Sequence, residues 1–423
     1  MRALLPLAWR SAWDRRATLL LTVLSIALST LLLLGVERIR TDVRAGFSDA
    51  VSGTDLVVGA RTGPVQLMLY AVFHLGGATN NIRWRSVQDI AAWPQVDWVV
   101  PLSLGDSHRG FPVLATVPAY FERFRYGDRQ ALRLREGRPF DGLFDAVVGA
   151  EVAERLGYRV GQRIVLSHGG GDGDGPGLAE HADRPFTVVG VLARTGTPAD
   201  RTVHIGLAAM EAIHLDWAGG APVPGMRFGP EQLRKFDLTP REVTAALVGL
   251  KSRAAVFAVQ RQVGAYAPEP LLAVLPGVAL DELWTVVGAG ERALLLMSAL
   301  VALVSLAGLA SVVLAGLQQR RRELAVLRAV GAGPRHILLL LALEGALTTL
   351  AGMAAGLLAT AAATVLAAPW LQSRFGIALH AGPPTGAQWG LLAALLAAGW
   401  TASALPALFA YRMSLADGLS PRQ

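Results

Sequence analysis

Two histidines and several aspartates flank a glycine-rich stretch in the first half of the chain. The stretch begins at Ser167 and reads SHGGGDGDGPGLAEHAD. Imidazole nitrogens and carboxylate oxygens are common ligands of divalent metal ions. The residues that offer such atoms are His168, Asp172, Asp174, His181 and Asp183, with His204 and His214 further along. A polar, glycine-rich segment is also typical of a solvated loop. The sequence favours the solvated loop and leaves a metal site as the alternative.

Patterns for other chemistry are missing from the sequence. A phosphate-binding loop needs G-x-x-x-x-G-K-[ST], and no such run occurs. The DGDG run matches half of a calcium loop but lacks its terminal glutamate. Neither the G-x-S-x-G elbow of hydrolases nor the H-E-x-x-H helix of metalloproteases is present, and the chain has no cysteine. We therefore expect no catalytic residue and no cofactor bound by this chain.

Long apolar segments dominate the rest of the chain. The mean hydropathy is +0.42 and 17% of residues are charged, which is too apolar for an ordinary soluble protein. Crossing the hydrocarbon core of a membrane takes about 20 helical residues. The segments of that length are Ala17–Val36, Ala293–Leu317, Ile337–Trp370 and Trp389–Tyr411. The first is longer than a signal-peptide core and lacks a small-residue cleavage site, so we interpret it as a retained helix.

Arginines indicate the orientation of these segments, because positive loops stay on the cytoplasmic side. The N-terminus carries Arg2, Arg10, Arg15 and Arg16. The loop after the second segment carries Arg320, Arg321, Arg322, Arg328 and Arg335. Both chain ends and this loop are therefore predicted to be cytoplasmic, with residues 37–292 on the other side. The net charge of +7 then reflects topology, and we do not expect nucleic acid as a partner.

The large hydrophilic region is predicted to be a mixed α/β domain. Short apolar runs with turn residues between them indicate strands. The predicted strands are Asp55–Ala60, Val96–Pro101, Asp145–Gly149, Gly161–Leu166 and Phe186–Leu192, and the predicted helices are Ser86–Trp93, Ala150–Leu156 and Thr239–Val248, with a further element at Ala254–Val263. From Leu280 the chain is predicted to run as one helix into the second membrane segment.

Three residues within the apolar segments are candidates for packing or gating. Glu344 is a single carboxylate in the third segment, and a charge in a membrane suggests a function. It lies about two helical turns from His336, which also allows a structural role near the interface. Gly352 and Gly356 are spaced so that another helix can approach closely. The partner helix could belong to the same chain or to a second subunit.

The cytoplasmic loop reads QQRRRELAVLRAVGAGPRHI from Gln318. Val326, Leu327 and Val330 share one face of a predicted short helix, and a Gly-Ala-Gly-Pro run ends it. Such a helix could dock in a groove of a cytoplasmic protein, or it could lie on anionic lipid. The residues alone leave both open.

The loop together with the LLLLALEGALTTLAG that follows resembles the signature of FtsX/MacB-type (type VII, mechanotransmission) ABC transporter permeases, and the chain is similar also to lipoprotein-releasing permeases. REGRPF, VVGAEVAERLGYRVGQRIVL and FTVVGVL are similar to the periplasmic domain of that family. The fold implied is an α-helical membrane protein with four transmembrane helices and a large mixed α/β periplasmic domain inserted between helices 1 and 2. The ATPase-coupling residues implied are Arg322, Glu323, Leu327, Arg328, Gly331 and Ala332. The glycine-rich stretch has no counterpart in this pattern.

The resemblance also implies partners and a location. Two copies of a separate ABC ATP-binding subunit would bind ATP and Mg, and a second permease would complete a dimer in the bacterial inner membrane. Membrane lipids would surround the helices. Whether a periplasmic adaptor or binding protein also takes part is left open. The divisions expected are an interfacial helix at 1–16, transmembrane helices at 17–36, 293–317, 337–370 and 389–411, a periplasmic domain at 37–292 with a stalk helix near 280–292, a coupling helix at 318–336, a periplasmic loop at 371–388 and a cytoplasmic tail at 412–423.

The implied function is to couple ATP hydrolysis to movement of the periplasmic domain, for export or extraction of a lipoprotein, lipid, peptide or antibiotic. One alternative is a signalling complex that activates a periplasmic partner such as a cell-wall hydrolase. Another is a metal-linked accessory that uses the histidine-bearing loop.

Overall fold

The computed structural model describes residues 16–50, 52–77, 80–168, 179–218, 221–223, 228–233, 235–319, 333–375 and 379–412. Its contacts divide the chain into two compact units. We call the first the helical unit, comprising Met1–Val43, Gly288–Gln372 and Leu379–Gln423. The second, the α/β unit, comprises Arg44–Val287 and Ser373–Ala378.

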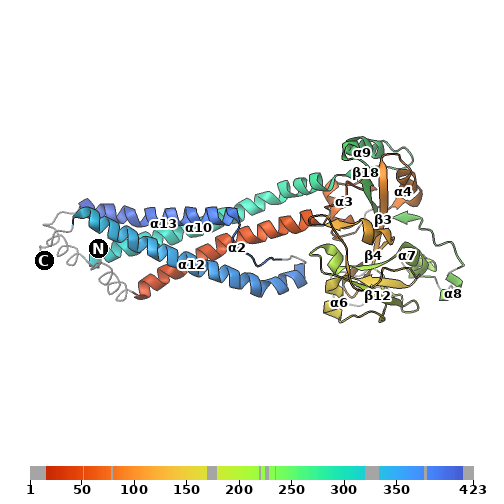
Figure 1. Ribbon diagram of the computed structural model, residues 1–423, viewed down its shortest axis with the longest axis horizontal. Helices are drawn as coiled ribbons and strands as arrows, with labels where there is room; N and C mark the ends of the chain where they lie inside the picture. The colour runs from red at the N-terminus through yellow and green to blue at the C-terminus, as the bar shows by residue number, and fades with distance from the viewer. Residues whose placement is uncertain are drawn as a thin grey trace. The chain divides into compact units, whose positions relative to one another are not determined.

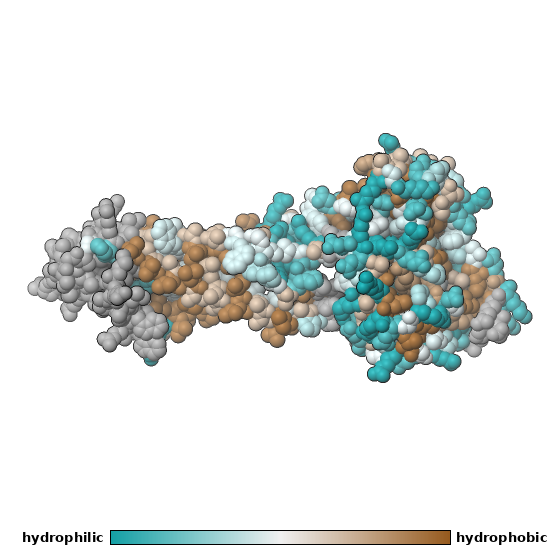
Figure 2. Space-filling model, in the orientation of Figure 1, coloured by the Kyte–Doolittle hydropathy of each residue, from teal (hydrophilic) through white to brown (hydrophobic). Residues whose placement is uncertain are grey.

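The described part of the helical unit is built from long helices that lie lengthwise beside one another (Figure 1). They are α2 (Arg16–Asp49), α10 (Pro276–Gln319), α12 (Pro334–Phe375) and α13 (Gly386–Arg412). The described residues contain 4 helices long and apolar enough to cross a membrane. Leucines such as Leu21 and Leu303 are more than 60% exposed on them, and Figure 2 shows this apolar surface in brown. A surface of this kind suits lipid rather than water.

Small residues let these helices approach closely. A Cβ added at Gly352 would lie 2.7 Å from the Cβ of Ile26, and one added at Gly356 would lie 2.5 Å from the Cβ of Thr30. α12 therefore packs against α2 of the same chain through these two glycines. The Oγ of Ser25 donates to the Oγ of Ser305 at 2.9 Å, which joins α2 to α10. Both features are typical of helix contacts in membranes.

The α/β unit is organised around a 12-stranded sheet in the order β18-β1-β17-β3-β4-β13-β8-β12-β7, with β9, β10 and β11 beside this path. The strands of the path are β1 (Leu56–Ala60), β3 (Val96–His108), β4 (Phe111–Thr116), β7 (Leu134–Gly137), β8 (Asp145–Val148), β12 (Phe186–Leu192), β13 (Val203–Gly206), β17 (Ala245–Leu250) and β18 (Leu271–Val274). The side strands are β9 (Arg163–Ile164), β10 (Ser167–His168) and β11 (Ala179–Glu180). Most neighbours are antiparallel, while β12–β8 and β13–β4 are parallel pairs.

Both faces of the sheet are buried, because alternate residues of a strand point to opposite faces. Leu56 and Val58 enter one core cluster, and Val57 between them enters the other. The first face is covered by α4 (Trp84–Ala91), α6 (Ala150–Leu156), α7 (Leu207–His214) and α9 (Val256–Gly264). The second is covered by α3 (Pro64–Ala71), α5 (Ala119–Arg123) and the first turns of α10. Strands buried on both sides explain the continuous apolar runs in the sequence.

Short elements complete the α/β unit. They are β2 (Ile82–Arg83) paired with β16 (Glu242–Val243), β5 (Arg125–Tyr126) paired with β6 (Gln130–Ala131), β14 (Trp217–Ala218) paired with β15 (Ala221–Pro222), α8 (Pro230–Leu233), and the 3-10 turns η1 (Pro198–Arg201) and η2 (Arg253–Ala255).

The structure confirms several predicted elements and corrects others. Ala150–Leu156 is a helix and Phe186–Leu192 a strand, as predicted. The prediction of a helix at Thr239–Val248 was wrong, because β16 and β17 lie there and β17 pairs with β1 and β3. Tertiary pairing decides in such a segment, since Ala and Leu fit a buried strand as well as a helix.

The described ends of the glycine-rich stretch are part of the fold. Ser167 and His168 form β10, and Ala179 and Glu180 form β11. His181 and the following Arg184 are 1% and 2% exposed, whereas Ala182 and Asp183 between them are exposed. Residues 169–178, between β10 and β11, lie outside the described part of the chain.

Candidate functional site

Four potential metal ligands meet at one edge of the large sheet, within the α/β unit. They are Asp106, His168, His181 and His214. Strand pairing places His168 of β10 directly opposite Asp106 of β3. His181 follows β11, which pairs with β10, and His214 is the last residue of α7. The pairing of β10 with β3 and with β11, together with the position of the end of α7, thus brings together residues that are far apart in the sequence. We call this group the histidine cluster.

The atoms that face one another in the histidine cluster are ring nitrogens and carboxylate oxygens. His168 Nδ1 lies 3.0 Å from Asp106 Oδ1 and 3.2 Å from His214 Nε2. His214 Nε2 is 3.4 Å from Asp106 Oδ1, and His181 Nε2 is 3.5 Å from Asp106 Oδ2. One ligand atom from each residue fits within a span of 4.8 Å. A single small ion could contact all four.

Burial in the histidine cluster is uneven. The side chains of Asp106 and His181 are 0% and 1% exposed, whereas His168 and His214 are 31% and 27% exposed. Asp106 Oδ2 and His181 Nε2 are buried without a hydrogen-bond partner among the described residues. Buried polar atoms almost always have partners, so this pair calls for a physical explanation.

Neighbouring groups fix the orientation of the cluster. His214 Nδ1 lies 2.9 Å from the carbonyl oxygen of Met210, to which its N–H donates, so that Nε2 faces the other ligands. The buried Arg184 guanidinium donates to the carbonyls of Ala212 and Ile213 at 2.9 and 3.0 Å and pairs with Asp216. These bonds satisfy carbonyls at the end of α7, which would otherwise lack partners. The end of α7, where His214 lies, is thereby held in place.

Burial and charge act differently on two of these imidazoles. Burial lowers the pKa of His181 to about 4, although the Asp106 carboxylate opposes this, so the ring is neutral at pH 7. Burial also disfavours the charged form of His214, but the Asp106 carboxylate and the Met210 carbonyl outweigh it and raise the pKa of His214. A neutral imidazole beside a carboxylate is a suitable metal ligand.

The sequence anticipated part of this group. His168 and His181 do come together, and His214 joins them from further along the chain. Asp172 and Asp174 lie outside the described residues. His204 is elsewhere, buried against Tyr120 and Phe121. Asp106 was missed because its strand lies far from the glycine-rich stretch in the sequence, and only the β3–β10 pairing places it opposite His168.

The remaining predicted site residues fall into two groups. The predicted coupling residues Arg322, Glu323, Leu327, Arg328, Gly331 and Ala332 all lie outside the described part of the chain. Glu344 lines a pocket between helices together with Leu19 of α2 and Leu309 of α10. Its gating role stays a prediction.

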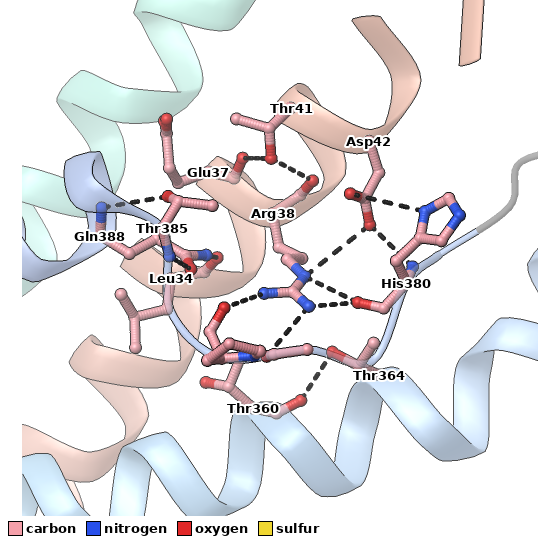
Figure 3. A network of polar contacts seen from close by, with 12 residues as sticks. Leu34, Glu37, Arg38, Thr41, Asp42, Thr360, Thr364, His380, Thr385 and Gln388 are labelled. Atoms are coloured by element: carbon pink, nitrogen blue, oxygen red, sulfur yellow. Dashed lines mark hydrogen bonds and ion pairs between the residues drawn. The ribbon is translucent and has the colours of Figure 1, made fainter. Parts of the chain in front are cut away.

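The helical unit contains a second polar site, which was not foreseen. Arg38 of α2 reaches the connection between α12 and α13, as Figure 3 shows. Its guanidinium donates to the carbonyl oxygens of His380, Gly382 and Pro383 at 3.0, 3.1 and 3.3 Å. Asp42 accepts the backbone N–H of His380 at 3.0 Å and lies 3.8 Å from Arg38 Nε. We call this group the Arg38 clamp.

Further bonds extend the contact around the Arg38 clamp. The Gln388 side chain, at the start of α13, donates to the carbonyl of Leu34 in α2 at 3.3 Å. Glu37 pairs with Arg40 at 2.7 Å, and Arg40 lies 4.0 Å from Glu291 of α10. One stretch of α2 is therefore tied to α10, to α13 and to the α12–α13 connection, all within the helical unit.

Long apolar helices with an α/β domain between the first and second are typical of a membrane protein, and two family models match this chain. The MacB-like periplasmic core domain matches residues 18–266, and the FtsX-like permease C-terminal matches residues 295–415. The first match alone covers more than half of the chain. The chain therefore belongs to the family of FtsX- and MacB-type permeases, which are components of ABC transporters.

Two of the solved structures that match the chain are of extracytoplasmic regions of other proteins. The periplasmic region of MacB from Actinobacillus actinomycetemcomitans is 10% identical, with a TM-score of 0.33 over 55% of this chain and 93% of that one. The extracellular domain of the noncanonic ABC-type transporter YknZ from Gram-positive bacteria is 12% identical, with a TM-score of 0.31 over 52% of this chain and 99% of that one. No curated protein matches the sequence.

Proposed function

We propose that this permease converts ATP hydrolysis by a separate subunit into movement of its α/β unit, which exports or extracts a hydrophobic or periplasmic cargo. The observation that carries this proposal is the continuity of two helices. α2 and α10 each have residues in both compact units and run without a break from one into the other. The family to which the chain belongs supplies the expectation that an ATPase drives them.

Contacts within the helical unit support coupled movement of these two helices. Ser25 and Ser29 of α2 both hydrogen-bond to Ser305 of α10, at 2.9 and 2.6 Å. Ile26 shares a core cluster with Leu306 and Leu309. Packed side chains and hydrogen bonds carry energetic coupling between distant sites. Displacement of α10 at one end would thus be shared with α2.

The proposed assembly has two ATP-binding subunits that hold ATP and Mg, and two permeases that form a homodimer. The complex lies in the bacterial inner membrane, with the ends of the chain and the segment 318–336 in the cytoplasm. By resemblance, Arg322, Glu323, Leu327, Arg328, Gly331 and Ala332 contact the ATPase.

Substitutions that change the charge of that segment test the coupling. Glu323→Arg and Leu327→Asp should abolish stimulation of the ATPase by the permease in nanodiscs, while membrane insertion stays normal. Gln318→Ala, in the last turn of α10 and outside the proposed contact, is the matched control. Normal copurification and stimulation of the ATPase with both variants would contradict the proposal.

A reversible cross-link tests the movement. The chain has no cysteine, so an introduced pair reacts without background. In Ser25→Cys/Ser305→Cys the two sulfurs would replace hydroxyls that are 2.9 Å apart, close enough for a disulfide after small shifts. Because the proposal has α2 and α10 move together, the oxidised protein should keep its cargo release. Loss of cargo release on oxidation, restored by reductant, would show that the two helices slide past each other and would contradict the coupled movement.

Cargo and topology need separate measurements. Mass spectrometry of proteins and lipids that copurify with the complex identifies the cargo. A bound cell-wall hydrolase without any cargo would favour the signalling alternative. Impermeant thiol reagents should label Arg159→Cys, exposed in the α/β unit, in intact spheroplasts. A cysteine placed at Gln423 should react only after lysis.

A further inference from the structure

We propose that Asp106, His168, His181 and His214 form a binding site for a divalent transition-metal ion, and that zinc is the ion that fits best. The proposal does not depend on the transported cargo or on the ATPase. It rests on the spacing of the four side chains, on two orphaned buried atoms and on the chemistry of the ligand set.

The spacing brings all four side chains within reach of one ion. Ligand atoms that bind zinc at about 2.0–2.2 Å in a tetrahedron lie about 3.3–3.6 Å from one another. Asp106 Oδ1, His168 Nδ1 and His214 Nε2 lie 3.0, 3.2 and 3.4 Å from one another, and His181 Nε2 lies 3.5 Å from Asp106 Oδ2. One ligand atom from each residue lies within 4.8 Å of the others, so small shifts of the side chains would complete a tetrahedral site. A ring nitrogen facing another ring nitrogen at 3.2 Å, as in His168 and His214, is a good hydrogen bond only if one is protonated and well aligned. A metal ion between them would satisfy both lone pairs.

Two buried atoms without hydrogen-bond partners also support metal binding. Asp106 Oδ2 and His181 Nε2 are buried, face each other at 3.5 Å and lack hydrogen-bond partners among the described residues. Leaving such atoms unpaired costs about 1–3 kcal/mol each in a typical protein. Coordination to a cation removes that cost for both atoms at once. It would also neutralise the buried Asp106 carboxylate.

The ligand set discriminates among metals. Three imidazoles and one carboxylate suit zinc and related transition metals, whereas calcium and magnesium prefer oxygen ligands. Outer contacts also fit, because the Met210 carbonyl accepts the Nδ1–H of His214 and leaves Nε2 for the metal. Trp217 packs on the His181 ring with 4.5 Å between ring centroids. An aromatic ring thus covers one side of the His181 imidazole.

The number and exposure of the ligands indicate a binding role rather than catalysis. A catalytic zinc keeps one position for water, whereas four protein ligands close the coordination shell. His168 and His214 are partly exposed, which gives an ion access from solvent. The loaded site would join β3, β10, the segment after β11 and α7 through one ion. Metal supply could in this way tune the rigidity of this edge of the α/β unit.

The experiment uses the full chain in nanodiscs, prepared without a polyhistidine tag and stripped with EDTA. Titration with zinc against a competing chelator should give one tightly bound ion per chain. Cobalt, a spectroscopic substitute, should give the intense visible absorption of tetrahedral coordination. Magnesium and calcium in excess should not displace it. Failure to bind zinc, or cobalt bound in octahedral geometry, would overturn the proposal.

Variants locate the ion. His168→Ala and His214→Ala remove partly exposed ligands and should each weaken zinc binding by at least about 100-fold, since loss of even an outer contact costs 10–100-fold. His380→Ala, an exposed histidine of the helical unit, is the matched control and should bind normally. Unchanged affinity in both cluster variants, with native thermal unfolding, would show that the metal binds elsewhere.

Asp106→Asn and His181→Ala alter buried residues and are checked for folding before binding is measured. Replacement of residues 169–178 by a short glycine-serine loop keeps all four ligands and lets β10 and β11 stay paired, so it should keep zinc binding. Loss of zinc binding on this replacement in a folded protein would contradict the assignment to the histidine cluster. ATPase stimulation, measured on the same samples, separates a failure of this site from a failure of the permease proposal.

Discussion

The histidine cluster and the Arg38 clamp both bring together polar side chains from distant parts of the sequence. They differ in whether all of their buried polar atoms have hydrogen-bond partners. Each guanidinium nitrogen of Arg38 donates to a backbone carbonyl of residues 380–383. In the histidine cluster, by contrast, Asp106 Oδ2 and His181 Nε2 have no hydrogen-bond partner among the described residues. One site is complete as it stands, and the other has capacity for a ligand.

This difference separates a structural role from a binding role. A saturated buried cation holds backbone segments together and gains nothing from a further partner. Unpaired buried atoms cost stability and persist where something else selects for them. Arg38→Ala and His181→Phe test that contrast directly, while acidification and Gly352→Leu test burial and helix packing elsewhere in the two units.

Arg38→Ala should cause the largest loss of stability. It removes the donor to the carbonyls of His380, Gly382 and Pro383 and leaves the Asp42 carboxylate without its cation. Breaking a buried pair by removing one partner typically costs about 3–5 kcal/mol. Thermal unfolding in nanodiscs measures the loss, and hydrogen exchange of peptides that cover 379–388 should locate it.

The matched control for the clamp is Arg253→Ala. Arg253 is 72% exposed and lies 3.7 Å from Asp55, so the change should alter stability by less than about 1 kcal/mol. Equal effects of the two arginine substitutions would show that the clamp is not a structural tie.

Acidification should destabilise the α/β unit more than the helical unit. Burial lowers the pKa of His204 to about 3 and that of His74 to about 4, both from 6.5. Between its pKa in the folded protein and 6.5, each of these histidines binds a proton in the unfolded chain but not in the folded chain. The free energy of unfolding therefore decreases as the pH decreases through this window. The loss between pH 7 and 5 is about 2 kcal/mol for each histidine.

Hydrogen exchange at pH 7 and pH 5, corrected for the intrinsic rate, reports this loss separately for the two units. His204→Phe should reduce the pH dependence, because the ring packs beside Tyr120 and Phe121 and carries no titratable group. An unchanged pH profile in this variant would argue against a neutral buried His204.

Gly352→Leu should disturb the packing of α12 on α2. Its Cβ alone would lie 2.7 Å from Ile26 Cβ, a distance that requires the helices to separate. Overpacking of this kind costs about 1–3 kcal/mol. Gly390→Leu in α13, where a Cβ meets nothing within 4 Å, is the control and should unfold like the parent protein. A similar melting temperature for both variants would contradict the close α12–α2 contact.

His181→Phe should have the smallest effect on the metal-free protein. It replaces an imidazole that has an unpaired buried nitrogen with an apolar ring of similar shape, and such changes are nearly neutral. We expect a change below about 1 kcal/mol together with loss of zinc binding. A strongly destabilised metal-free variant would mean that His181 is a structural residue like Arg38.

Some elements of the fold follow from local sequence, and others depend on partners that are distant in the chain. The four apolar segments, the strand at Phe186–Leu192 and the helix at Ala150–Leu156 were predicted because composition and periodicity are local properties. Thr239–Val248 was assigned to the wrong class, because its short apolar run fits either element and its strand partners lie far away in the chain.

The residues of the candidate sites also differ in whether the sequence alone could reveal them. His168 and His181 were singled out by their sequence context, since both flank one glycine-rich stretch. Asp106 joined them only through the pairing of β10 with β3, across a separation of 62 residues. Arg38 gave no signal either, because its acceptors are backbone carbonyls about 340 residues away, and any residue has a carbonyl. The sequence by itself determined which segments are apolar enough for a membrane; the tertiary structure decided which polar groups meet, because that depends on the register of strands and helices that are distant in the chain.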